Sequence, residues 1–275
     1  MKKIIFSAFI FPLVAGNIPG LSDIDKVREW RKANEHQILA EYFEFLSIPN
    51  SALDRENIQK NAEFIAAVLR KIGVEPRLLP SATPGTPPAV YGEVRVPGAA
   101  RTIVFYAHYD GQPAIPENWH PDIKPFQPVF LSHSIEKGGS VLPRPKPGEA
   151  INPEWRISGR SSSDDKAGVM LILNAYKALT ESNIQPTSNI KFFFEGEEEI
   201  GSVHLSEIRN CYGPTSGSSP MAPCISPACP CWISECAAMS IWRSRSMAPN
   251  GLFTADTTAT GRPIPPCGLP NCSLR

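Results

Sequence analysis

An apolar run that leads directly into a group of carboxylates is the feature that most constrains the fold of this chain. Residues 192–194 read Phe-Phe-Phe, and residues 195–202 read EGEEEIGS. A short apolar run bounded by turn residues is typical of a strand buried in a layered structure. Carboxylates this close together repel one another unless a cation lies among them. The run therefore predicts a buried strand with a cation site at its carboxyl end.

The rest of residues 22–208 alternates between helical and strand patterns. Helical periodicity covers residues 22–46, 57–72 and 166–179, with a cap signal at Ser22 and a stop at Gly73. Strand patterns cover residues 76–79, 89–96, 102–107 and 189–194. Because residues 102–107 are continuously apolar, we expect that strand to be covered on both faces. The alternation predicts an α/β layered fold, whose site residues gather at the carboxyl ends of strands.

Two further turns carry residues suited to metal chemistry. His108 and Asp110 follow the apolar run 102–107, and Asp164-Asp165 follows a Ser/Gly loop. Each has a plainer explanation: a His–Asp pair can be satisfied within a loop, aspartates cap helices, and a run of glutamates can be a solvated turn. Taken together, acid-bearing turns after several apolar runs, one with a histidine, favour a hydrolytic metal site.

Composition limits the partners and suggests a compartment. The net charge is zero, which gives no indication of a nucleic-acid or anionic-membrane partner. Lys2 and Lys3 precede an apolar run over residues 4–15, which small residues Ala15 and Gly16 close. This pattern predicts a secretory signal peptide over residues 1–16, with a disordered or helical extension as the alternative. We expect a secreted or periplasmic protein, or a cytoplasmic one if the alternative holds.

The composition changes abruptly near residue 210. All seven cysteines follow it, lysine is absent after it, and no periodicity persists there. One interpretation is a small disulfide or zinc module around Cys229, Cys231 and Cys236. However, the spacing of these cysteines fits no usual zinc pattern, and an odd number of cysteines cannot all pair in disulfides. The other is a segment never selected to fold, and we expect residues 209–275 to be an irregular, disordered tail.

The genetic code offers a reason for such a tail. Each codon of the neighbouring frame takes the last base of one codon and the first two of the next. Residues 214–226 can then be encoded so that this frame reads DVWLLSDGPVHQ, and residues 250–267 so that it reads RPLHSGHYGNWAPNPAM. Both strings have the strand, His and Asp content that the visible tail lacks. We therefore predict a frameshift near Ile208, and a gene without a frame-restored continuation downstream would contradict it.

Three ordered motifs carry a resemblance to a known family. They are HYDGQP at 108–113, GRSSSDDKAG at 159–168 and EGEEEIGS at 195–202. They resemble the zinc-dependent peptidases and deacylases that include glutamate carboxypeptidase, carnosine dipeptidase, acetylornithine deacetylase and succinyl-diaminopimelate desuccinylase. Looser matches are EFLSIPNSALD at 44–54 and Trp119 with Pro125-Phe126, which together with Gln112-Pro113 suggest the dipeptidase-like branch. The resemblance implies the partial catalytic domain of a di-zinc exopeptidase fold, which we place at residues 17–208.

The resemblance also implies roles for individual residues. His108 corresponds to a ligand of one Zn²⁺ ion, Glu199 to a ligand of a second, and Asp164 to the carboxylate that bridges both. Asp110 corresponds to the acid that orients His108, and Glu198 to the general base. The ions could also be Co²⁺ or Mn²⁺. Asp165 falls at a variable family position and is left out of the catalytic set.

The family uses more parts than the visible chain displays. A further acidic ligand, a second metal-binding histidine and a lid domain through which the family commonly dimerises are not recognisable here. The neighbouring-frame strings SDGPVHQ and PLHSGHYGN would supply the acid and a lid motif.

We therefore expect a truncated, frameshifted relative of a dipeptidase, carboxypeptidase or deacylase. Its substrate would be a small peptide or N-acyl amino acid with a free carboxylate, and the chain itself would be inactive. The alternatives are a non-catalytic fragment that acts as a binding module, and a tail that binds metal by itself.

Overall fold

The computed structural model describes residues 21–210 together with residues 224 and 225. The predicted signal peptide and most of the predicted tail lie outside the described residues. The helices are α1 Asp23–Ala33, α2 Glu35–Leu46, α3 Arg55–Lys71, α4 Lys166–Glu181 and α5 Leu205–Asn210. The strands are β1 Pro76–Leu79, β2 Ala89–Val94, β3 Thr102–His108, β4 Val129–Leu131, β5 Val141–Leu142, β6 Arg156–Ser158, β7 Asn189–Glu195 and β8 Cys224–Ile225.

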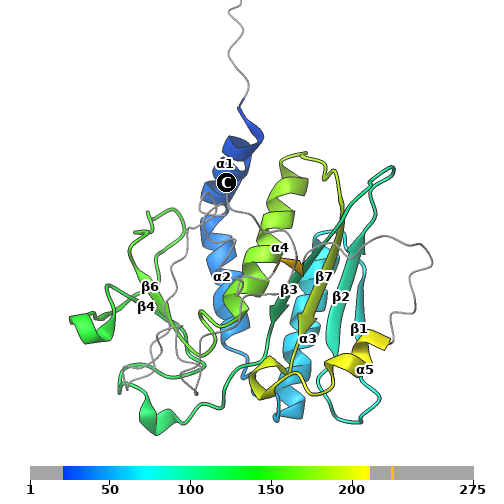
Figure 1. The fold of residues 1–275 in the computed structure, drawn as a ribbon. Helices are drawn as coiled ribbons and strands as arrows, with labels where there is room; N and C mark the ends of the chain where they lie inside the picture. The colour runs from blue at the N-terminus through cyan, green and yellow to red at the C-terminus, as the bar shows by residue number, and fades with distance from the viewer. Residues whose placement is uncertain (1–20, 211–223, 226–275) are drawn as a thin grey trace, which may run out of the picture.

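The main sheet brings the ends of β3 and β7 to one edge. Its strand order is β1-β2-β7-β3-β8. β1, β2 and β7 pair antiparallel, whereas β3 runs parallel to β7, with His108 opposite Glu195. Both carboxyl ends therefore point to the same side of the molecule, at the bottom of Figure 1, where the turn after β7 also lies. The predicted α/β class is confirmed.

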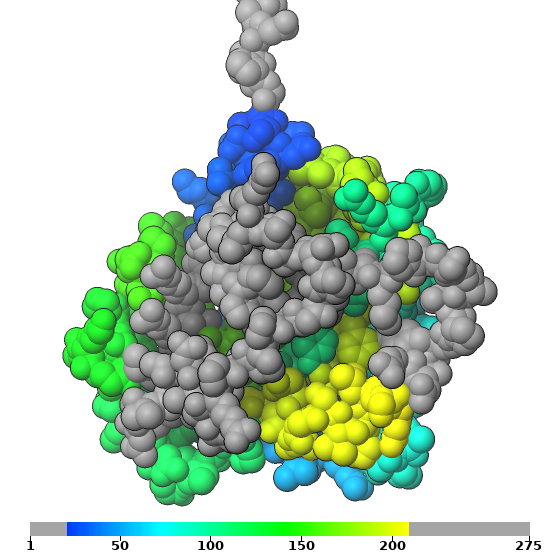
Figure 2. Space-filling view, in the orientation of Figure 1, coloured from blue at the N-terminus to red at the C-terminus, as the bar shows by residue number. Residues whose placement is uncertain are grey.

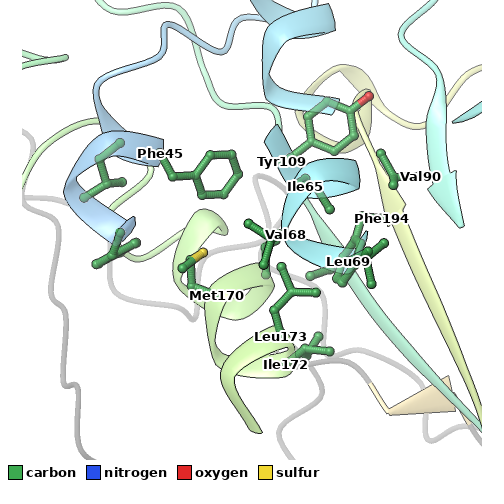
Figure 3. Close-up of a cluster of buried hydrophobic side chains, with 14 of the residues drawn as sticks. Phe45, Ile65, Val68, Leu69, Val90, Tyr109, Met170, Ile172, Leu173 and Phe194 are labelled. Carbon is green, nitrogen blue, oxygen red and sulfur yellow. The ribbon is translucent and has the colours of Figure 1, made fainter. Parts of the chain in front are cut away.

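The apolar run of β7 divides its side chains between two clusters. Phe192 and Phe194 are fully buried in the main core with side chains of α2, α3 and α4. Figure 3 shows Phe194 beside Leu69 of α3, with Leu173 of α4 in the same cluster. Phe193 instead packs on the second cluster with Tyr91 and Ile208. Burying each such side chain stabilises the fold by roughly 1.5–3 kcal/mol, so this strand is held from both faces.

The prediction that the neighbouring strand is covered on both faces was wrong for most of its length. In β3, residues 102–106 are half-buried, and only Ala107 and His108 are buried. The helix α4 contacts β3, but the second cluster lies over β1, β2 and β7. Among the described residues, therefore, β3 is well covered only at the end that carries His108.

The predicted single helix over residues 22–46 is two helices that meet at Asn34. The Asn34 side chain donates to the carbonyl of Trp30 at 2.8 Å, and its backbone N–H bonds to Trp30 and Arg31. Asparagine side chains compete with the helical backbone in this way and end helices. The predicted Ser22 cap is confirmed, since its hydroxyl accepts from the Asp25 N–H, and Gly73 adopts a left-handed φ of 80° after α3.

A small second sheet was not predicted. It has the strand order β5-β4-β6 and lies between β3 and α4 in the sequence. Its strands have two or three residues, too few for a period-two pattern to be recognised. Within the described residues, no helix has the length and apolar character needed to cross a membrane.

Candidate metal centre

His108 is the last residue of β3 and lies at the centre of the candidate site. Its side chain is buried, and both ring nitrogens face carboxylates. Nδ1 lies 3.2 Å from Asp110 Oδ1, and Nε2 lies 2.8 Å from Asp164 Oδ1. Nε2 also lies 3.7 Å from Glu198 Oε2. The structure thus brings residues of all three predicted motifs into one cluster.

Asp110 joins His108 to the turn at residues 195–202, which is called the acidic turn below. It is fully buried, and its carboxylate accepts the backbone N–H groups of Glu198 at 3.2 Å and Glu199 at 3.0 Å. With the bond to His108, the Asp110 oxygens are shared between the ends of β3 and β7. A carboxylate on one ring nitrogen fixes the tautomer and leaves the other nitrogen for a ligand. The position of Asp110 fits the predicted orienting role, which stays a prediction.

Asp164 and Asp165 are adjacent but have opposite environments. The side chain of Asp164 is 71% exposed, with Oδ1 toward His108. Asp165 is buried, caps α4 by accepting from Gly168 N at 3.1 Å, and also accepts from His108 N at 3.4 Å. Any Cβ at position 168 would lie 2.2 Å from Asp165 Oδ1, so the cap requires glycine there. Of these two aspartates, therefore, only Asp164 has a carboxylate that is exposed and available to bind a metal ion.

The segment that carries Glu198 and Glu199 leads into the yellow surface region of Figure 2. They begin a short 3₁₀ turn, Glu198–Ile200, which Gly201 ends with a left-handed φ of 92°. The Glu199 carboxylate accepts from Gln112 Nε2 at 2.8 Å, and Gln112 belongs to the first motif. Burial raises the pKa of Glu199, and the charge of Asp164 raises it further, while the Gln112 bond opposes the shift. Glu199 is therefore placed near Asp164 but is held by Gln112.

The charges around His108 favour its protonated form in the metal-free chain. Burial alone would lower its pKa, but the bonds to Asp110 and Asp164 and the charge of Asp165 raise it to about 11. The same bond to His108 lowers the pKa of Asp164, against the effect of burial. Burial raises the pKa of Asp165 to about 7. The pocket therefore attracts a positive charge, which a proton supplies here and a metal ion could supply instead.

Two carboxylates of the acidic turn have structural partners that the sequence did not indicate. Glu197 is buried and bonds to Nδ1 of His204 at 3.0 Å and 3.1 Å. Glu195, also buried, accepts a hydrogen bond from the Tyr106 hydroxyl, and burial raises its pKa. No periodicity or motif connects these pairs, so only the strand register and the turn geometry reveal them. They hold the turn and leave Glu198 and Glu199 facing the site.

The donor set fits part of a metal centre. Among residues 21–210, no three His, Cys, Asp or Glu side chains are already arranged as a group that could hold an ion. Two ligands of one tetrahedral ion, each roughly 2.0–2.1 Å from it, would lie about 3.3 Å apart. The 2.8 Å separation of His108 Nε2 and Asp164 Oδ1 is close to that value. A small shift of the exposed Asp164 would therefore admit an ion, and the Glu198 carboxylate lies 3.7 Å from the same ring nitrogen.

A buried histidine and several carboxylates at parallel strand ends are the kinds of donor groups that metallohydrolase sites use. Residues 104–223 match the profile described as Peptidase family M20/M25/M40. Residues 104–223 are therefore similar to this peptidase family, and the similar proteins fit its dipeptidase-like branch.

Similar curated proteins are dipeptidases. The chain is 29% identical over 150 residues to the Cys-Gly metallodipeptidase DUG1 of Candida albicans, covering 54% of this chain and 26% of that protein. It is 23% identical over 198 residues to the Beta-Ala-His dipeptidase of Homo sapiens, covering 67% of this chain and 34% of that protein. The chain therefore spans about a quarter to a third of these relatives.

Solved structures show the same fold. The Saccharomyces cerevisiae dipeptidase Dug1p superposes with a TM-score of 0.54 at 24% identity, covering 68% of this chain and 38% of that one. Human carnosine dipeptidase 1 gives a TM-score of 0.54 at 21% identity, with coverage of 69% and 38%. The likeness shows that this chain shares the fold of these two dipeptidases over 38% of their length.

Proposed function

We propose that this domain serves metal-dependent hydrolysis of an amide bond in a small substrate with a free carboxylate. The observation that carries the proposal is the position of His108, with Nδ1 on Asp110 and Nε2 toward Asp164 and Glu198. Dipeptides are the first substrates to consider, because the similar curated proteins are named for cleaving Cys-Gly and β-Ala-His.

We assign His108, Asp164 and Glu199 as the residues that would hold two Zn²⁺ ions, with Asp164 as the carboxylate that the two ions would share. Co²⁺ and Mn²⁺ suit the same nitrogen and oxygen donors. Such ions lower the pKa of bound water and polarise a scissile carbonyl. Asp110 holds the His108 ring in the orientation that exposes Nε2, and its bonds to two backbone N–H groups fix the acidic turn beside it.

We assign Glu198 as the general base. Its side chain is 46% exposed, and its Oε2 lies 3.7 Å from His108 Nε2. The Glu198 backbone N–H donates to Asp110, and this bond keeps the Glu198 side chain near the proposed ligands. A carboxylate placed in this way can take a proton from a nucleophile and return it to the leaving amine.

We also propose that the chain as written turns over little or no substrate. A catalytic zinc has three protein ligands as a rule, and the described residues supply fewer than that for each of two ions. The frameshift, the signal peptide and the lid-mediated dimer of the family stay proposals. Sequencing of the gene tests the first, and N-terminal sequencing of exported protein tests the second.

The experiment combines ion binding with turnover. Purified chain is titrated with Mn²⁺, which suits carboxylate and imidazole ligands better than the thiolates of the cysteine-rich tail. Dipeptide hydrolysis is then measured with and without Zn²⁺ in the wild type, Glu198→Gln and Glu199→Gln. We expect Glu199→Gln to weaken binding and Glu198→Gln to leave it intact, with little hydrolysis throughout.

Robust metal-dependent hydrolysis that Glu198→Gln abolishes would refute inactivity and support the assigned base. A wild type that binds no ion would contradict the metal centre, and a cooperative melt of the same soluble monomer would then favour the binding-module alternative.

A further inference from the structure

The loop between α2 and α3 contains a buried asparagine that touches two of the site-bearing segments. Asn50 is fully buried. Its Nδ2 donates to the Tyr109 carbonyl at 2.9 Å and to the Ser161 hydroxyl at 2.9 Å. The backbone carbonyl of Asn50 accepts a hydrogen bond from the Gly111 N–H at 2.9 Å. A single residue thus bonds on one side to the turn of His108 and on the other to the loop that leads to Asp164.

The two segments that Asn50 joins are in close contact. A Cβ at Gly111 would lie 2.3 Å from Ser161 Oγ and 2.9 Å from Asn50 Nδ2, so only glycine allows this approach. Ser161 is itself buried and has a left-handed φ of 59°. The separation of the two segments is therefore set by direct packing with the amide of Asn50 between them.

The same stretch of chain also holds the start of α4. Lys166 follows Asp165 and is fully buried, and its ammonium donates to the carbonyls of Phe45 at 2.7 Å and Ile48 at 2.8 Å. Residues 45–50 are therefore hydrogen-bonded on both sides of Asp164, because Asn50 donates to Ser161 and the carbonyls of Phe45 and Ile48 accept from Lys166. Among the hydrogen bonds of the described residues, none joins residues 45–50 to the side chains of the candidate ligands, so we expect the influence of this stretch to pass through the segments that carry them.

We propose that Asn50 is a positioning residue that fixes the distance between the His108 turn and the Asp164 loop, and with it the geometry offered to a metal ion. The inference rests on the proposed metal centre. Removing a residue that orients metal ligands typically lowers the metal affinity about 10- to 100-fold. We expect a loss in this range for Asn50→Leu, which keeps the approximate shape but removes both donors.

The chain contains a matched control. Asn61 is also fully buried, and its Nδ2 donates to the carbonyls of Pro49 at 2.8 Å and Asn57 at 2.7 Å. In the described part of the chain, Oδ1 of both asparagines lacks a hydrogen-bond partner. The two residues thus have equal burial and equal bonding capacity, but Asn61 holds only the α2–α3 region and bonds to neither ligand-bearing segment.

The test compares the full chain carrying Asn50→Leu or Asn61→Leu with the wild type. Mn²⁺ affinity is measured from the EPR signal of free Mn²⁺, and peptide-level hydrogen exchange is measured on metal-free protein. Both substitutions should lower thermal stability to a similar extent. Only Asn50→Leu should weaken Mn²⁺ binding and increase exchange over residues 108–111 and 159–165. Asn50→Ala and Asn61→Ala form a second pair if a leucine variant does not fold.

Equal Mn²⁺ affinities or equal exchange patterns in the two variants would overturn the inference. If the wild type binds no Mn²⁺, the proposed function fails, and the positioning role is decided by exchange in the metal-free chain. Increased exchange in the two site segments for the Asn50 variant alone would still support it. Changes confined to the α2–α3 region in both variants would refute it.

Discussion

Two His-x-Asp triplets, at 108–110 and 120–122, have the same spacing and different structures. His108 and Asp110 are buried at the end of β3, 3.2 Å apart, and Asp110 also accepts two backbone N–H groups. His120 and Asp122 are exposed by 39% and 74%, 3.7 Å apart, and His120 Nδ1 accepts from the Asp122 N–H. Spacing alone therefore does not define the site.

In both pairs the carboxylate lies nearest Nδ1, so the difference between them lies in burial and in what faces Nε2. In the first triplet, the carboxylate faces Nδ1, and Nε2 points to Asp164. In the second, Nδ1 accepts a local backbone hydrogen bond, and solvent screens the carboxylate. A strand end supplies burial and a fixed direction, whereas a loop supplies neither. The same comparison provides a control for each prediction about His108 and Asp110.

The largest effect is expected for the histidine itself. His108→Gln removes the imidazole ligand, and we expect Mn²⁺ affinity to fall by more than about 100-fold, since loss of a direct ligand exceeds the loss for an orienting partner. His120→Gln should leave affinity within about twofold, because surface changes away from the site have little effect. Calorimetric titration of both variants checks this, and equal losses would contradict the assignment.

The orienting acid should have the next largest effect. Asp110→Asn cannot accept all the bonds that the carboxylate accepts, so we expect affinity to fall about 10- to 100-fold. We also expect the free energy of unfolding to fall by about 2–3 kcal/mol, because hydrogen bonds to charged groups are lost from a buried position. Denaturant unfolding of Asp110→Asn against Asp122→Asn measures this. A cost at Asp122 as large as that at Asp110 would remove the distinction between the two triplets.

The raised pKa of His108 predicts the direction of two pH effects in its triplet. Its pKa is about 11 in the folded chain and 6.5 in the ordinary case. The stabilising contribution of the protonated ring is therefore complete below pH 6.5 and is lost as the pH rises toward 11. Thermal melts in a chelator should show this decline in the wild type and not in His108→Gln. A metal must displace the same proton, so affinity should rise about tenfold per pH unit near neutrality.

Much of this arrangement could be predicted from local patterns. The apolar run 192–194 and the turn after it required only a strand that ends in charged residues, and both are present. The same holds for α3 with its Gly73 stop and for α4, because period and caps are properties of a short window. The assignment of roles to His108, Asp164 and Glu199 came from the family resemblance and is still to be tested.

Other features depended on contacts that no window contains. Asp164 and Asp165 are neighbours with equal chemistry, and only the start of α4 decides which of them is buried as a cap. The half-burial of β3 depends on which strands the second cluster covers. The break at Asn34 depended on a side chain that competes with the helical backbone, and this is a weak signal within an otherwise periodic stretch.

The smallest effect is expected for Gln112, which joins the first motif to Glu199. Gln112→Leu removes two exposed hydrogen bonds to Glu199, so we expect a loss of about 1 kcal/mol in stability and less than a tenfold change in Mn²⁺ affinity. Gln59→Leu is the control, since Gln59 makes a similar bond to Glu63 on an exposed helix face. A change of 100-fold or more in Gln112→Leu would mean that Glu199 is positioned by Gln112 rather than by the turn.

The central claim is that an ion binds at the ends of β3 and β7, between the first triplet and Asp164. Anomalous scattering at the zinc edge from crystals soaked in Zn²⁺ tests it most directly. We predict a peak within coordination distance of His108 Nε2 and Asp164, with Glu199 beside it. Anomalous density confined to the cysteine-rich segment or to His120 and Asp122, with none at His108, would contradict the account.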